Sequence, residues 1–397
     1  MSKQNKTVCF FRNKRITLIN VSQHSMNTHT TDWPAARIVH LTGGCRAINF
    51  DGPPTKFQPR TLNGGKVQFR VHSYKTLYVD LKDYGLVPIG LDFYSSSLET
   101  TGHIPPDWRS YHPSNDTPWP CQVEIDRASQ IGHAAFRQKN AKLWDIASRL
   151  SHQLRVSSWR LRQISEAYQD QLHARLNSKE FCLGSRFIDS YTWLAYLSIQ
   201  AFLVDACVFR DYLAEFYASF VCTDTAILEG QTITAMGSLR KRVLEKTKIK
   251  DETTTELVRA TEPGGWLHTL GAYRDLVVHC APIASAETRL MALCSEIAIG
   301  TTASIPAITL PIPADPTKIS KSRSSGTHFQ DLENEFLFFV RANRGDTPSS
   351  DGLIYCYTAL GELARLTKLI LDRSPIEPEI IHITNKDING KITVKKV

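Results

Sequence analysis

The residues best suited to chemistry gather in one short stretch, Tyr273 to Cys280, which reads YRDLVVHC. Arg274 stays charged at any physiological pH, and its planar guanidinium can hold two phosphate oxygens at once. Histidine is the side chain that most often exchanges protons at neutral pH, so His279 is suited to accept or deliver a proton. Asp275 can orient a neighbouring group. An arginine and a histidine five positions apart therefore suit chemistry at a phosphate ester.

This stretch resembles the signature of the HEPN family, in which an Arg, a polar residue and a His keep an R-x4–6-H spacing on an all-α bundle. Arg274, Asp275 and His279 match those three positions. The resemblance implies a metal-independent endoribonuclease, and Arg274 would stabilise the phosphate while Asp275 orients a neighbour. His279 would transfer a proton or position the 2′-hydroxyl. The family also implies a homodimer with a composite active site, and roles as a toxin or antiviral defence effector with an antitoxin or defence-system partner protein.

The R-x4–6-H spacing is loose, and the chain contains it three times. The pair Arg127–His133 has an alanine after its arginine, and the pair Arg323–His328 lies in a Ser-rich stretch that would hold neither side chain. Only Arg274–His279 combines a polar second residue with an apolar, helical setting. The structural alternative for this pair is an arginine bound to a carboxylate and a histidine near a helix end, where its charge meets the helix dipole favourably.

Geometry limits how the Arg274–His279 pair can act. Residues five apart on an ideal helix are separated by about 140°. The two side chains converge only if the helix is distorted, if His279 sits in a fraying last turn, or if the site spans two subunits. Pro282 disfavours helical conformation in the residue before it, which favours the second option.

Contacts with RNA are expected from other residues nearby in the sequence. The basic run Arg240, Lys241 and Arg242 can bind phosphates, and Tyr273 can stack on a base, although core packing is the alternative for this aromatic ring. A formal net charge of +8 at pH 7 also favours a polyanionic partner. The alternative to a nuclease is a non-catalytic helical adaptor that binds RNA, a nucleotide or a protein partner.

Several other functions lack their motifs. The chain has no P-loop, no G-x-G-x-x-G, no H-E-x-x-H and no G-x-S-x-G, and we expect neither a metal nor another cofactor. Its nine cysteines include no C-x-x-C pair, which favours reduced thiols over zinc or disulfide sites. The most apolar run, 193–209, contains Gln200 and Asp205, which favours a core helix over a membrane span. We expect a soluble, cytoplasmic protein with no membrane partner.

The elements that position these residues divide the chain into four parts. Residues 1–34 form a polar arm with two possible short strands. Residues 35–124 are β-rich, and their proline-rich stretch 103–120 is expected to be a surface connection. Residues 125–376 show helical periodicity, with a linker at about 303–327, and residues 377–397 form a tail with a turn at Asn389-Gly390.

The fold class predicted from this pattern is α+β and mainly α: a HEPN-like up-and-down helical bundle preceded by a smaller β-rich region. The predicted strands span 36–41, 47–50, 66–72 and 76–79. The predicted helices span 143–172, 189–220, 236–246, 251–261, 266–280, 283–298, 329–342 and 353–371.

Overall fold

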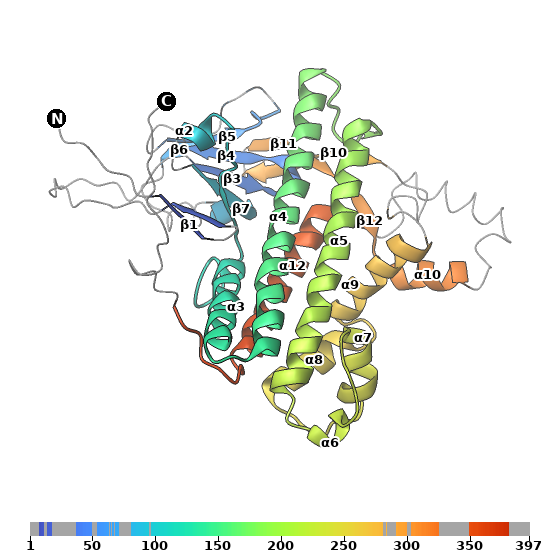
Figure 1. Cartoon of the computed structure of the whole chain (residues 1–397). Coiled ribbons are helices and arrows are strands. Elements are labelled where there is room, and N and C mark those ends of the chain that lie inside the picture. The colour runs from blue at the N-terminus through green and yellow to red at the C-terminus, as the bar shows by residue number, and fades with distance from the viewer. Residues whose placement is uncertain are drawn as a thin grey trace, which may run out of the picture. The chain divides into compact units, whose positions relative to one another are not determined.

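The structure is a computed structural model of the whole chain (Figure 1), and the residues it describes are 8–11, 14–17, 37–49, 54–62, 64, 66, 68–70, 81–94, 97–280, 283, 291–299, 303–324 and 349–380. Residues 31–378 form one compact unit, and residues 1–30 with 379–397 form another. In the smaller unit, β1 (Val8–Phe11) and β2 (Lys14–Thr17) make an antiparallel hairpin. The first strand lies where it was expected, at 8–11, and the second begins two residues before the expected range 16–19.

The larger unit is a mixed α+β structure in which helices predominate. Its main sheet has six antiparallel strands in the order β6-β5-β4-β3-β7-β8. The central strands are buried on both faces, as expected where helices cover the sheet. The strand bounds are β3 Arg37–Leu41, β4 Arg46–Asn49, β5 Pro54–Gln58, β6 Gln68–Arg70, β7 Pro88–Phe93 and β8 Asp107–Ser110.

The turn between β3 and β4, η1 (Thr42–Gly44), joins the sheet to the rest of the unit. Gly43 and Gly44 have φ values of 68° and 80°, which residues with a Cβ rarely adopt. A Cβ on Gly43 would lie 2.6 Å from the Cβ of Ala307, and one on Gly44 would lie 2.6 Å from the carbonyl oxygen of Tyr168. Only glycine therefore lets this turn lie directly against its neighbours.

Long helices form the second layer. Figure 1 shows α3 (Pro120–Arg137), α4 (Ala141–Asn177) and α5 (Ser190–Phe216) alongside one another, with α12 (Gly352–Leu371) in contact with all three. α4 has 37 residues, which gives a length of about 55 Å. α5 begins with a capping box at Asp189 and continues into a π-helical turn, η2 (Tyr217–Val221).

The α5 segment is the most apolar part of the described chain. Together with η2 it is the one described helix long and apolar enough to cross a membrane, with a mean hydropathy of 1.5 in its most apolar stretch. Half of that stretch is buried against the rest of the protein, and Trp193, Leu194 and Leu197 near the start of α5 are more than half exposed. One hydrophobic core includes residues of both the six-stranded sheet and the long helices.

Shorter elements complete the unit. A second antiparallel sheet has the order β11-β10-β9, and β12 pairs with β13. The helices are α2 Ser97–Thr100, α6 Thr225–Leu228, α7 Met236–Leu239 with η3 Arg240–Leu244, α8 Glu252–Thr261, α9 Trp266–Asp275 with η4 Leu276–Cys280, and α10 Pro316–Ser324. The strands are β9 Arg186–Phe187, β10 Ala292–Ile299, β11 Ala303–Thr309, β12 Pro311–Pro313 and β13 Ser349–Asp351.

Three sequence-based predictions are wrong. The helix expected at 283–298 is replaced at 292–299 by strand β10, and the linker expected at 303–327 contains β11, β12 and α10. The proline-rich stretch 103–120 is not only a connection, because it contributes β8 to the main sheet. The predicted strand 76–79, helix 329–342 and turn 389–390 lie outside the described residues.

Candidate functional site: a basic pocket beside α9

The helix that carries Arg274 is fixed by a close contact at its start. α9 follows Pro263-Gly264-Gly265, and Gly265 is its N-cap. A Cβ on Gly265 would lie 2.4 Å from the carbonyl oxygen of Ala260, so this glycine lets α9 begin directly against the end of α8. The chain therefore turns sharply between α8 and α9, and α9 also contacts α5 and α10.

A pocket of about 940 Å³ lies between α5, α7 with η3, α9 and α10. Six cationic side chains line it against two carboxylates, which leaves a positive excess suited to a phosphate-bearing ligand. The carboxylates are Asp211 and Asp275. The cations are Arg210, Arg240, Lys241, Arg242, Arg274 and Lys321.

Five of the seven residues predicted from the sequence lie in this pocket. Arg274 and Asp275 come from the last turn of α9, and the basic run 240–242 comes from η3, more than 30 positions earlier. Arg274 is 31% exposed and forms an ion pair of 3.2 Å with Asp275. The structure thus brings the proposed phosphate-gripping arginine and the expected RNA contacts to one place.

The two other predicted residues lie elsewhere. Tyr273 is 1% exposed, packs against Tyr355 and donates a hydrogen bond to the carbonyl of Pro313. It offers no free face to a base, so the expected stacking role is wrong and its role is core packing. His279 is exposed on η4 and is not among the residues that line the pocket.

The turn that carries His279 is distorted, which affects the angle of about 140° that would separate Arg274 from His279 on an ideal helix. Residues Leu276–Cys280 form a π-helical turn rather than α-helix. A π turn takes more residues per turn than an α turn, so positions five apart lie nearer to the same face. Leu276 is buried against Ile319 of α10, which anchors the turn. The described chain has two further π-helical turns, η2 and η3, so this turn by itself does not mark a site.

Arg210 is nearly buried and packs closely against α9. Its guanidinium lies over Gly271, where a Cβ would come within 2.4 Å of Nη1. Nη2 of Arg210 donates to Asp211 at 3.3 Å, and the same carboxylate oxygen accepts from the backbone N–H of Met236 at 3.0 Å. Burial raises the pKa of the neighbouring Cys207 thiol, and the charges of Arg210 and Arg274 oppose that rise.

Sequence reasoning missed three further pocket residues. Arg210 follows the apolar run of α5, Lys321 lies in the stretch expected to be a linker, and His268 belongs to α9 itself. One signal was available for His268. It precedes Asp275 by seven positions, which places both side chains on one helical face. The contributions of α5 and α10 depend on tertiary packing and leave no such local signal.

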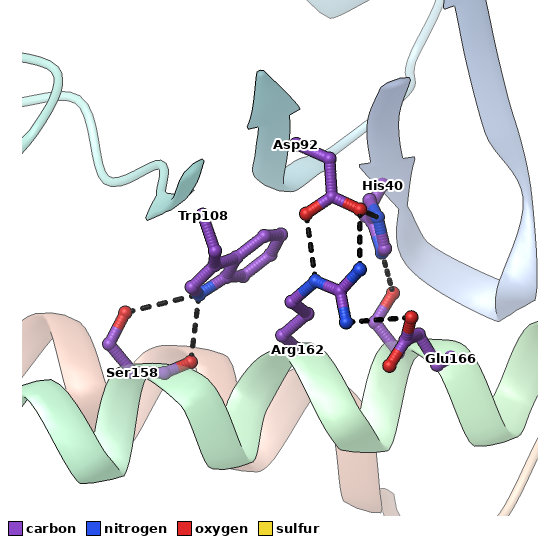
Figure 2. A network of polar contacts seen from close by, with 7 residues as sticks. His40, Asp92, Trp108, Ser158, Arg162 and Glu166 are labelled. Carbon is purple, nitrogen blue, oxygen red and sulfur yellow. Dashed lines mark hydrogen bonds and ion pairs between the residues drawn. The ribbon is translucent and has the colours of Figure 1, made fainter. Parts of the chain in front are cut away.

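A second cluster of titratable groups lies under the main sheet (Figure 2). Asp92 of β7 accepts two hydrogen bonds of 2.8 Å from Arg162 of α4, and Arg162 also pairs with Glu166 at 2.7 Å. Nε2 of His40 lies 3.1 Å from Asp92, and its Nδ1 lies 3.1 Å from the hydroxyl of Ser165. An ionised Asp92 only accepts, so His40 donates from Nε2 and accepts the Ser165 proton at Nδ1.

This Ser165–His40–Asp92 arrangement resembles a hydrolase triad in its contacts but not in its access. His40 is fully buried, and Asp92 and Ser165 are 1% and 2% exposed, so a substrate cannot reach the hydroxyl. Burial lowers the pKa of His40 to about 4, which keeps the ring neutral. Burial alone would raise the pKa of Asp92, but hydrogen bonds from His40 and Arg162 outweigh it and hold that pKa at about 2. The cluster joins the sheet to α4.

Within the described ranges, no group of three or more His, Cys, Asp or Glu side chains is placed to hold a metal ion. Comparison of the chain with protein-family models, with curated proteins and with solved structures found no match.

Proposed function

We propose that this protein is a metal-independent endoribonuclease of the HEPN type, whose basic pocket holds the phosphate of the bond to be cut. The observation that carries the proposal is the convergence of Arg274, Asp275 and the basic run 240–242 in one pocket, beside the π-helical turn that bears His279. Six cations against two carboxylates favour a polyanion such as RNA.

The proposed reaction is attack of a 2′-hydroxyl on the adjacent phosphate. A base removes the 2′-proton, the O2′–P bond forms, the P–O5′ bond breaks, and an acid protonates the departing 5′-oxygen. The products are a 2′,3′-cyclic phosphate and a free 5′-hydroxyl. Arg274 stabilises the charge that builds on the phosphate oxygens, Asp275 holds Arg274 in place, and His279 transfers a proton or positions the 2′-hydroxyl.

The proposed active form is a homodimer in the cytoplasm. Within one copy, His279 does not line the pocket that contains Arg274, and the histidine that does so is His268. A composite site solves this, because the exposed His279 of one copy can enter the pocket of the other. The proposal extends to a toxin or antiviral defence effector, with an antitoxin or defence-system protein as a further partner.

The decisive experiment is incubation of the full chain with total RNA and tRNA in excess EDTA. We expect cleavage by the wild type to fall at least about 100-fold in His279→Ala and in Arg274→Ala, the effect of losing a proton-transfer or phosphate-stabilising group. Lys82→Ala is the matched control, because Lys82 is exposed and lines neither pocket described here. Full cleavage by both His279→Ala and Arg274→Ala, with folding intact, would overturn the proposal.

The same assay tests the composite site. A co-expressed mixture of Arg274→Ala and His279→Ala chains can place one intact Arg274 opposite one intact His279. We expect the mixture to recover up to about a quarter of wild-type cleavage if the site spans two copies, because about half of the random dimers contain both variants and each of these has one intact site of two. A mixture as inactive as its two components would show that Arg274 and His279 act within one copy, and the composite site would be overturned.

The second candidate function is an RNA-binding adaptor without catalysis. It is favoured by the exposure of His279 outside the pocket and by the exposure of Lys241 and Arg242 within it. This function predicts binding of RNA that weakens steeply with salt, with no cleavage by the wild type.

A further inference from the structure

A second pocket lies where the main sheet meets the carboxyl end of α4. It encloses about 750 Å³, within the range of small-molecule sites. Strand β5 and the turn after it form one wall, and the last turns of α4 form the other. Gly44 of the η1 turn and Pro306 of β11 complete the lining.

Among the described residues, all the charged side chains that line this pocket are cationic. Lys56, Arg60 and Lys66 come from the sheet side, and Lys179 follows α4. Each is exposed, and none forms an ion pair with a carboxylate in the described part of the chain. The carboxyl end of α4 adds a negative partial charge of about half a unit, which four full positive charges exceed. An anion carrying several charges fits this lining best.

The pocket also has an apolar floor. Phe57 and Leu172 are buried there, and Leu176 and Phe181 are partly exposed beside them. An inorganic phosphate would gain nothing from contact with an apolar surface, whereas a planar ring can pack against it. The amide side chains are Gln58, Gln169 and Asn177, and each offers both a donor and an acceptor to the edge of a ring.

Lys179 is held in an unusual backbone conformation. It follows the C-cap Ser178 with φ of 60°, in the left-handed region where glycine usually ends a helix. A residue with a Cβ costs about 1–2 kcal/mol there. Lys139, after α3, has φ of 59° and lines neither pocket. The two lysines therefore share their backbone strain and differ in whether they face a pocket.

We propose that this second pocket binds a nucleotide that carries two or more phosphates. The four cations hold the phosphates, the apolar floor takes the base, and the amides contact its edge. The ligand binds here whether or not the protein cleaves RNA, because none of these residues belongs to the pocket beside α9.

The test is calorimetric titration of the full chain with ATP, GTP, CTP and UTP, each in EDTA so that the protein's own cations face the phosphates. Inorganic triphosphate and the matching nucleosides are titrated in parallel. We expect at least one nucleotide to bind about tenfold or more tightly than both of its parts, since each part meets only half of the lining. The inference is overturned if no nucleotide binds, or if inorganic triphosphate binds as tightly as the nucleotides.

Lys179→Gly and Lys139→Gly form the matched pair of variants. Both remove a charge and relieve the same backbone strain, so both should raise the melting temperature. Only Lys179→Gly should weaken nucleotide binding, by about tenfold, the loss expected for one charge-assisted contact. Equal affinities in the two variants would overturn the inference.

Lys241→Ala separates this inference from the proposed nuclease. Lys241 lines the pocket beside α9, so its loss should leave nucleotide affinity unchanged. If Lys241→Ala abolishes nucleotide binding while Lys179→Gly keeps it, the nucleotide occupies the basic pocket beside α9 and the inference fails. If the protein does not cleave RNA in the EDTA assay, nucleotide binding at the second pocket is still expected.

Discussion

The polar network under the sheet and the basic pocket beside α9 both contain paired arginines, but only the pocket also has exposed cations with no carboxylate partner among the described residues. Arg162 in the network is 13% exposed and donates its hydrogen bonds to Asp92 and Glu166 (Figure 2). Lys241 and Arg242 in the pocket are exposed, and neither pairs with a carboxylate among the described residues.

The difference follows from solvation. A charge taken out of water is costly unless opposite charges and hydrogen bonds replace its hydration, so the network is tolerated only when complete. A charge at an open pocket keeps its water until a ligand replaces it. The network residues should therefore matter for stability, and the exposed pocket cations should matter for binding.

The largest effect is expected from Asp92→Ala. This change leaves Arg162 nearly buried with one partner fewer and removes the acceptor for His40, so we expect a loss of about 3–5 kcal/mol in the free energy of unfolding. Urea unfolding followed by circular dichroism measures it. The control is Asp107→Ala, because Asp107 forms an exposed pair with Arg109 and should cost less than about 1 kcal/mol. Similar losses of unfolding free energy in the two variants would contradict the stabilising role of the buried network.

A smaller effect is expected from pH acting on His40. Its pKa of about 4 in the folded protein lies below its usual 6.5, so between these values the unfolded chain binds a proton that the folded chain does not. Stability from this group is complete above pH 6.5 and falls as the pH drops towards 4. Between pH 7.5 and 5 we expect a loss of about 2 kcal/mol from His40 alone.

His40→Asn isolates that contribution, because asparagine can hydrogen-bond to Asp92 but does not titrate. Burial also lowers the pKa of His112 to about 4 and raises that of Glu124 to about 7, so the total pH dependence is a sum of opposing terms. Those groups are present in both proteins and cancel in the difference. Urea unfolding at pH 7.5 and 5 should give a weaker pH dependence for the variant, and equal dependences would contradict the assigned pKa.

Periodicity predicted the long helices well because each buries its own stripe. α4, α5 and α12 lie where the repeats of apolar residues indicated. β10 was mistaken for a helix because its eight residues, ALCSEIAI, contain apolar positions at both helical and strand spacings. β8 was missed because prolines surround it, although its Trp108 is buried and hydrogen-bonds to Ser158. Its pairing with β7 decides its conformation, and that pairing is not local.

The basic pocket was predictable only in part, for a related reason. The sequence singled out Arg274 by its spacing from a histidine and the run 240–242 by its charge. That these lie together depends on how α7 and α9 pack on α5. Arg210 is 61 positions from Gly271, yet its guanidinium fits where that glycine has no side chain. No local sequence pattern in either segment predicts this contact.

The smallest effect on stability is expected from Lys241→Ala and Arg242→Ala. Because these side chains are exposed, each change should shift the free energy of unfolding by no more than about 0.5 kcal/mol. Each should nevertheless lower the slope of log K for RNA against log salt by about one, the effect of one lost phosphate contact. Binding of a single-stranded RNA at several KCl concentrations measures the slope, with Lys82→Ala as the control. Unchanged slopes in both variants would mean that these cations contact no phosphate. The buried network would then still stabilise the fold, but the exposed pocket cations would have no role in RNA binding.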